Sequence, residues 1–153
     1  MRIARFVLCL VCAVIFSASA ALASATHASK EEAQAMCEKA VALIKSEGPE
    51  KAAAKFQDKN GGFIDRDLYV FALDDKGNFV AHGAKPVLIG KGGLEMKDVS
   101  GFEFIKAFVA VKDKAWVDYK WPDVTDNNKV KAKSTYIVRE GNHVVGVGYF
   151  KED

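Results

Sequence analysis

The sequence lacks the short motifs that mark the most familiar enzyme active sites. It has no Cys-x-x-Cys or His-Glu-x-x-His motif, no glycine-rich phosphate loop and no Gly-x-Ser-x-Gly elbow. The oxygen-bearing residues Asp74, Asp75 and Asn78 form too short a stretch for a calcium loop and lack its downstream glutamate, so they indicate a hairpin turn. We therefore expect a protein that is not an enzyme and that holds no cofactor and no metal.

An excess of one charge sign is also missing. The chain has 22 Lys and Arg residues against 20 Asp and Glu residues, and loss of Arg2 and Arg5 with an N-terminal leader would make the two numbers equal. The lysines are interspersed with acidic residues, whereas nucleic-acid binding proteins usually carry a basic patch or stripe. We expect no nucleic-acid partner.

The N-terminus has the pattern of a secretory signal peptide. Arg2 and Arg5 precede an apolar run at residues 6–16, and a series of small residues follows that run. We predict that residues 1–25 are the signal peptide and that residues 26–153 form the mature chain.

The fate of this leader has more than one interpretation. Cleavage after Ala25 is the first choice and cleavage after Ala23 the second, because both positions follow small residues at alternate sites. An uncleaved leader would serve as a membrane anchor, since its apolar and small residues together approach the roughly 20 residues that span a bilayer. Cys9 and Cys12 lie within the apolar run and are not part of a lipobox, so we predict no lipoprotein.

Cysteine is scarce in the mature chain, where Cys37 stands alone. An internal disulfide is therefore excluded. Cys37 shares a helical stripe with Ala33, Ala40 and Ile44, which favours a buried core thiol because free cysteine behaves as a small hydrophobic residue. An intermolecular bridge or a reactive thiol is the alternative.

Two helices are predicted at the start of the mature chain. Residues 28–46 carry apolar side chains at helical spacing, with Ser29 as the N-cap and Glu32 three residues later as its capping-box partner. A Gly-Pro pair ends this helix, and residues 50–57 follow as a short second one. The first helix has one apolar face and should pack against a sheet.

The remainder of the chain predicts an antiparallel sheet. Five segments rich in branched and aromatic residues are bounded by turn residues, and residues 102–112 form a helical crossover between the second and third of them. The fold class is therefore α+β, with a long N-terminal helix on one face of a five-stranded sheet and shorter segments over the other. The last three strands should form a meander, and the five strands are expected at residues 69–73, 78–82, 115–121, 133–139 and 143–150.

Five side chains are candidates for a binding site. His82 ends a strand beside loops, where binding groups tend to lie. Tyr119 and Trp121 share one face of a strand and could form an apolar wall with hydrogen-bond donors at its edge. Lys133 and Tyr136 could hold a carboxylate, the lysine as the cation and the phenol as a directional donor. An ordinary structural or surface role is the alternative for each of them.

Several blocks of sequence, in this order, resemble the single Cache domain of the second type, an extracytoplasmic sensor module of bacterial chemoreceptors and histidine kinases. The resemblance implies a PAS-like sheet with a long helix behind it and a small-molecule pocket in front, usually for short organic acids. It also implies that His82, Tyr119, Trp121, Lys133 and Tyr136 line that pocket. The blocks are YVFALDDKGNFVAHGAKPVLIGK at residues 69–91, LEMKD at 94–98, WVDYKWP at 116–122, KSTYIV at 133–138 and VVGVGYF at 144–150.

The expected function is a periplasmic domain that binds or senses a small molecule, with a short carboxylate as the leading ligand class. The sequence ends three residues after the last predicted strand, so we expect no output module of its own and a role in signal transduction or chemotaxis through a membrane receptor partner. The alternative is an interaction module without a ligand that pairs with such a receptor, or with itself, through the helix at residues 28–46. A monomer and a weak homodimer both remain open.

Overall fold

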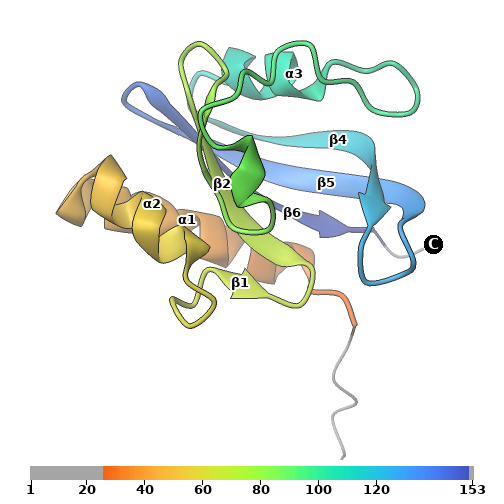
Figure 1. Cartoon of the computed structure of the whole chain (residues 1–153), viewed down its shortest axis with the longest axis horizontal. Helices are drawn as coiled ribbons and strands as arrows, with labels where there is room; N and C mark the ends of the chain where they lie inside the picture. The colour runs from red at the N-terminus through yellow and green to blue at the C-terminus, as the bar shows by residue number, and fades with distance from the viewer. Residues whose placement is uncertain (1–25, 152–153) are drawn as a thin grey trace, which may run out of the picture.

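The computed structural model describes residues 26–151, so the predicted signal peptide and its cleavage positions lie outside the described residues. An antiparallel sheet lies between two layers (Figure 1). Helices α1 (Lys30–Glu47) and α2 (Pro49–Gln57) cover one face of the sheet, and α3 (Phe104–Ala110) with the loops around it covers the other (Figure 1). The predicted α+β class is confirmed.

Helix α1 spans Lys30–Glu47 and has the predicted capping box. The backbone N–H of Glu32 donates to Ser29 Oγ at 3.2 Å, and the backbone N–H of Ser29 donates to Glu32 Oε2 at 2.7 Å. These two bonds satisfy N–H groups that the first turn of a helix leaves unpaired. Gly48 ends the helix with a φ of 86°, and α2 follows at Pro49–Gln57.

The apolar stripe of α1 packs against the protein's own sheet. Ala33, Cys37, Ala40 and Ile44 are all buried there. The Cys37 thiol donates to the carbonyl oxygens of Tyr136 and Val145 at 3.6 Å each, which confirms the predicted core thiol. The same stripe is therefore not free to pair with a second helix.

The sheet has six strands, one more than predicted. The extra strand β1 has two residues, too few to show the alternation that identifies a strand in a sequence. The order is β1-β2-β6-β5-β4, with β3 paired to β2, and the predicted meander of the last three strands is confirmed. The strands are β1 at Ile64–Asp65, β2 at Leu68–Asp74, β3 at Phe79–His82, β4 at Lys114–Asp123, β5 at Lys129–Glu140 and β6 at His143–Phe150.

Alternation along the strands divides the core between the two faces of the sheet. On β2, Val70 and Ala72 face α1 and α2, while Phe71 and Leu73 face the other side. Helix α3, at Phe104–Ala110, buries three side chains against that other side. The 3₁₀ turn at Pro86–Leu88 lies on the same side, where Leu88 packs against the core. This second face carries the aromatic side chains around which the candidate site forms.

Within residues 26–151, none of the helices combines the length and the apolar composition needed to cross a membrane.

Candidate functional site

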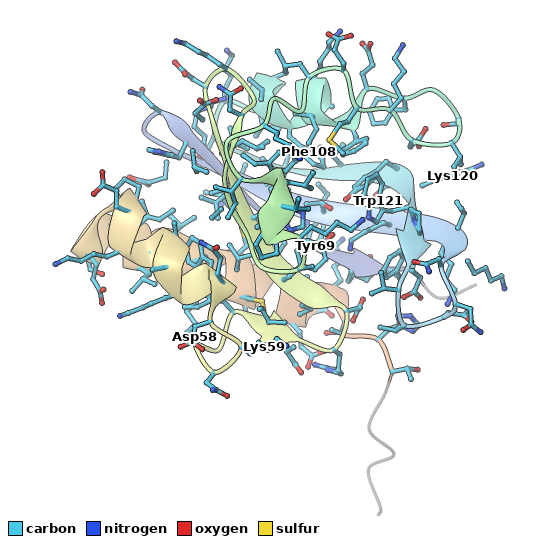
Figure 2. The ribbon with its side chains drawn as sticks, in the orientation of Figure 1. Asp58, Lys59, Tyr69, Phe108, Lys120 and Trp121 are labelled. Atoms are coloured by element: carbon cyan, nitrogen blue, oxygen red, sulfur yellow. The ribbon has the colours of Figure 1, made fainter. Side chains whose placement is uncertain are left out.

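Two adjacent cavities lie on the α3 side of the sheet. The first has a volume of about 20 Å³ and a mainly aromatic lining. The second has a volume of about 80 Å³ and includes charged side chains in its lining. Tyr69 and Trp121 line both cavities and form the partition between them. Figure 2 shows these two residues and Phe108 around the same interior region below α3.

His82 lies at the end of β3, against the first cavity, and is 5 % exposed. Its Nδ1 accepts a hydrogen bond from the backbone N–H of Lys85 at 2.9 Å, so the neutral ring carries its proton on Nε2. Burial, together with the positive charges of Lys85 and Lys133, lowers the pKa of His82 to about 4. At neutral pH the imidazole is therefore an uncharged hydrogen-bond donor.

Lys133 is the most unusual group of the site because its side chain is buried, at 1 % exposure, without a carboxylate partner in the described part of the chain. Among the ion pairs of the described residues, none involves Lys133. Its Nζ donates to the Tyr69 hydroxyl at 3.4 Å and lies 4.6 Å from the Tyr69 ring centre and 4.4 Å from the Phe150 ring centre. Lysine is seldom fully buried unless it is paired, so this ammonium group has capacity for an anion.

Tyr119 supplies a second protected polar group on β4. Its hydroxyl accepts a hydrogen bond from Thr135 Oγ1 at 3.1 Å, and its ring stacks on Phe104 at 4.7 Å between centroids. Burial raises the pKa of Tyr119, and the nearby Tyr69 adds to this effect. The phenol therefore keeps its proton at physiological pH and can donate a hydrogen bond.

Trp121 closes the site at the far end of β4. Its half-buried ring makes an edge contact with Phe104 at 5.2 Å, and Lys85 Nζ, which belongs to the lining of the second cavity, lies 5.4 Å from its centre. Indole gives a large apolar surface with one N–H donor, which suits a wall that meets solvent.

Tyr136 does not belong to this site, and its predicted place in the pocket is corrected by the structure. It lies on the opposite face of the sheet, among the core residues packed beneath α1, with its ring 5.0 Å from that of Trp116. The reason is the strand period: Lys133 and Tyr136 are three residues apart on β5, so their side chains point to opposite faces.

The other four predicted residues lie on one face of the sheet but in two cavities. His82 and Tyr119 line the first, Lys133 lines the second, and Trp121 lines both. Tyr69, which was not among the predicted residues, connects the two sets through its stacking on His82 at 4.9 Å and its bond to Lys133. Its alternation with Phe71 on β2 was the available signal, because it puts Tyr69 on the same face as an apolar core residue.

The arrangement is suited to binding a small anion that also has an apolar part. It offers one buried cation, neutral donors from His82 and Tyr119, and aromatic walls. Within the part of the chain that the structure describes, His, Cys, Asp and Glu side chains do not gather in groups of three or more that could hold a metal ion.

Comparison with known families gives a match over nearly the whole chain. Residues 10–153 match the family model described as Single Cache domain 2. Among curated proteins, none is similar enough to this chain to count as a match.

Solved structures with the same fold include three sensor proteins. A methyl-accepting chemotaxis protein from Vibrio parahaemolyticus RIMD 2210633 aligns with a TM-score of 0.67 and 24 % identity, over 79 % of this chain and 87 % of that chain. A Cache chemosensory domain studied for carboxylic acid recognition aligns with a TM-score of 0.59 and 18 % identity, over 80 % of this chain and 88 % of that chain. A periplasmic sensor domain of a chemotaxis protein aligns with a TM-score of 0.60 and 20 % identity, over 80 % of this chain and 90 % of that chain. At these identities the likeness shows the fold.

Proposed function

This chain belongs to the Single Cache domain 2 family, and from that premise we propose that it is a periplasmic sensor domain that binds a short organic acid. The proposal depends on one observation: the ammonium group of Lys133 is buried without a carboxylate partner among the described residues. A carboxylate ligand would supply the missing negative charge in a place where water does not screen it.

The lining of the site narrows the ligand class. The first cavity is walled by apolar side chains such as Phe71, Phe79 and Phe108, which suit a hydrocarbon group and disfavour a second charge. The small volumes of about 20 and 80 Å³ limit the ligand to a few heavy atoms. Lys133 would bind the carboxylate in the second cavity, and His82 and Tyr119 would donate to a hydroxyl or keto group where the part of the ligand in the first cavity carries one.

The relatives support the same class of function. One structural neighbour is a Cache chemosensory domain studied for carboxylic acid recognition, and another is a periplasmic sensor domain of a chemotaxis protein. By analogy, residues 26–153 are proposed as one extracytoplasmic domain that is exported by a signal peptide at residues 1–25.

Calorimetry on residues 26–153 tests the proposal. Acetate, propionate and butyrate should release or absorb heat with a saturable isotherm, whereas propionamide, which matches propionate in size, and propylamine, which carries the opposite charge, should not bind. Lys133→Met should abolish the signal, and Lys120→Met, an exposed lysine on the neighbouring strand β4, should leave it unchanged. Equal binding of propionate and propionamide would contradict the proposal, because the buried cation would then play no part.

A further inference from the structure

Tyr69 occupies the polar groups that a ligand of this site would need. Its hydroxyl accepts the hydrogen bond from Lys133 Nζ, and its ring covers the imidazole of His82 with an interplanar angle of 24°. It therefore acts as the partner of Lys133 in the absence of a ligand. The bond is long, at 3.4 Å, and replaces an ionic partner with a neutral one.

The two cavities are too small to be used separately. A volume of about 20 Å³ holds little more than one water molecule, so the aromatic cavity cannot admit even a short hydrocarbon chain as it stands. The second cavity contains the cation but has a volume of only about 80 Å³. Both cavities would become one if the partition between them moved.

Tyr69 is the half of the partition that is bonded to Lys133, so its displacement would free the ammonium group for a ligand. Tyr69 is half-buried, whereas its neighbours on the same face, Phe71 and His82, are buried. The Trp121 ring is half-buried too, so exposure alone does not distinguish the two halves of the partition. Trp121, the other half, is held by edge contacts with both Phe104 and Tyr119.

We propose that Tyr69 is a displaceable gate that sets ligand size, and that a monocarboxylate enters by taking the place of its hydroxyl on Lys133. The displaced ring would join the two cavities, so the carboxylate would lie at Lys133 and the hydrocarbon chain beside His82 in the aromatic cavity. The proposal rests on the carboxylate-binding function proposed above. It adds a named residue that competes with the ligand and limits the length of its chain.

Tyr69→Phe gives the sharpest test because the ring remains and only the competing hydroxyl is lost. Removing one net hydrogen bond that the ligand must break should tighten propionate binding roughly three- to tenfold in calorimetry. If the Tyr69 hydroxyl instead binds the ligand directly, the same change will weaken binding. Tyr149→Phe, a half-buried tyrosine on the opposite face, is the matched control and should leave binding unchanged.

A second variant tests the size limit. Tyr69→Ala should bind hexanoate, which the wild-type protein should exclude, while Trp121→Ala should not gain hexanoate binding if Tyr69 alone is the gate. In NMR spectra of the wild-type protein, propionate should shift the ring signals of His82, assigned with His82→Asn, because the stacked Tyr69 ring moves away.

The outcomes separate this inference from the proposed function. If propionate binds the wild-type protein and Tyr69→Phe binds it equally or more weakly, the gate is overturned and the carboxylate site stands. Unchanged His82 signals with propionate bound would also overturn the gate. If neither protein binds any carboxylate, the proposed function itself fails and the gate fails with it.

Discussion

Thr135 on β5 lies directly opposite Gly148 on β6, and the space above this glycine is filled by side chains of the candidate site. A Cβ atom at position 148 would clash with Thr135 Oγ1 and lie 2.7 Å from Lys133 Cε. The absence of a side chain at Gly148 therefore leaves room for the aliphatic part of the Lys133 side chain. This glycine provides space for a neighbour, and no unusual backbone conformation is needed to explain it.

The first prediction concerns this space. Gly148→Ala should lower the free energy of unfolding by about 1–3 kcal/mol, because overpacking forces Thr135 and Lys133 from their positions. Urea denaturation of residues 26–153 measures the change. Gly92→Ala is the control, since the nearest neighbour of its Cβ, Asn78 Oδ1, would lie at an ordinary 3.4 Å. Equal losses in the two variants would show that close packing at Gly148 is not the cause.

The second prediction concerns the cost of burying Lys133. In the absence of a ligand, Lys133→Met should raise the free energy of unfolding by about 1–2 kcal/mol, because a side chain of similar volume replaces a buried charge that has no ionic partner within residues 26–151. Lys120→Met, at an exposed position, should change it by less than about 0.5 kcal/mol. Urea denaturation compares the variants, and a destabilised Lys133→Met would show that the ammonium group is already well compensated.

The third prediction concerns pH and His82. Burial and the nearby lysines lower its pKa to about 4 from an ordinary 6.5, so between these values the unfolded state binds the proton and the folded state does not. The free energy of unfolding should therefore fall as pH drops from about 6.5 to 4, with up to about 3 kcal/mol arising from this residue. Below pH 4 the contribution is fully lost.

A variant isolates this effect from the titration of other groups. His82→Asn keeps an acceptor near the backbone N–H of Lys85 and removes the titrating ring. Chemical denaturation at a series of pH values should show a shallower loss for this variant between pH 6.5 and 4 than for the wild-type protein. His143→Asn, at the start of β6, controls for loss of a histidine. Identical slopes for wild type and His82→Asn would refute the assignment.

The fourth prediction concerns Asp67, which joins the two ends of the described chain. Its Oδ1 accepts the backbone N–H of Ala28 at 2.7 Å and its Oδ2 accepts that of Phe150 at 3.2 Å. Asp67→Asn replaces one acceptor with an NH₂ group that faces a donor and should cost about 1–3 kcal/mol. Thermal denaturation measures the loss, and Asp65→Asn, an exposed neighbour, should cost much less.

The fifth prediction concerns Cys37. Burial raises the pKa of its thiol to about 12, so almost no thiolate exists at neutral pH. A disulfide reagent such as DTNB should label native residues 26–153 only at the rate at which the protein unfolds, and one thiol should react promptly in guanidinium chloride. Rapid labelling of the native protein would contradict the buried position.

Much of the fold followed from local signals in the sequence. The capping box of Ser29 and Glu32, the hairpin turn at Asp74 and the alternation of the long strands are all readable from neighbouring residues, and each is present in the structure. The strand β1 was missed because two residues are too few to show the alternating pattern of a strand. The β4–β5 hairpin is longer than predicted, since pairing continues to Asp123 and Lys129, beyond the predicted strand ends at residues 121 and 133.

Sequence patterns identified individual residues of the candidate site but not how these residues come together. Alternation correctly placed Tyr119 and Trp121 on one face of a strand, and the same rule separates Lys133 from Tyr136, which the prediction had joined. Tyr69 had no chemical signal of its own, because an aromatic residue in a strand is usually part of the core. Its position in the candidate site depends on its contacts with His82 and Lys133, which come from two other strands.

The sequence by itself determined which side chains share a face within each strand, because the strand period of two is a local property of the backbone. It could not determine which faces of different strands lie on the same side of the sheet. That choice depends on the register between strands and on the elements that cover each face. Only the tertiary structure decided that Lys133, a residue type normally solvated, is buried between Tyr69 and Phe150. The physical reason is that strand pairing places Gly148 beside it and leaves room for a buried cation facing a small cavity.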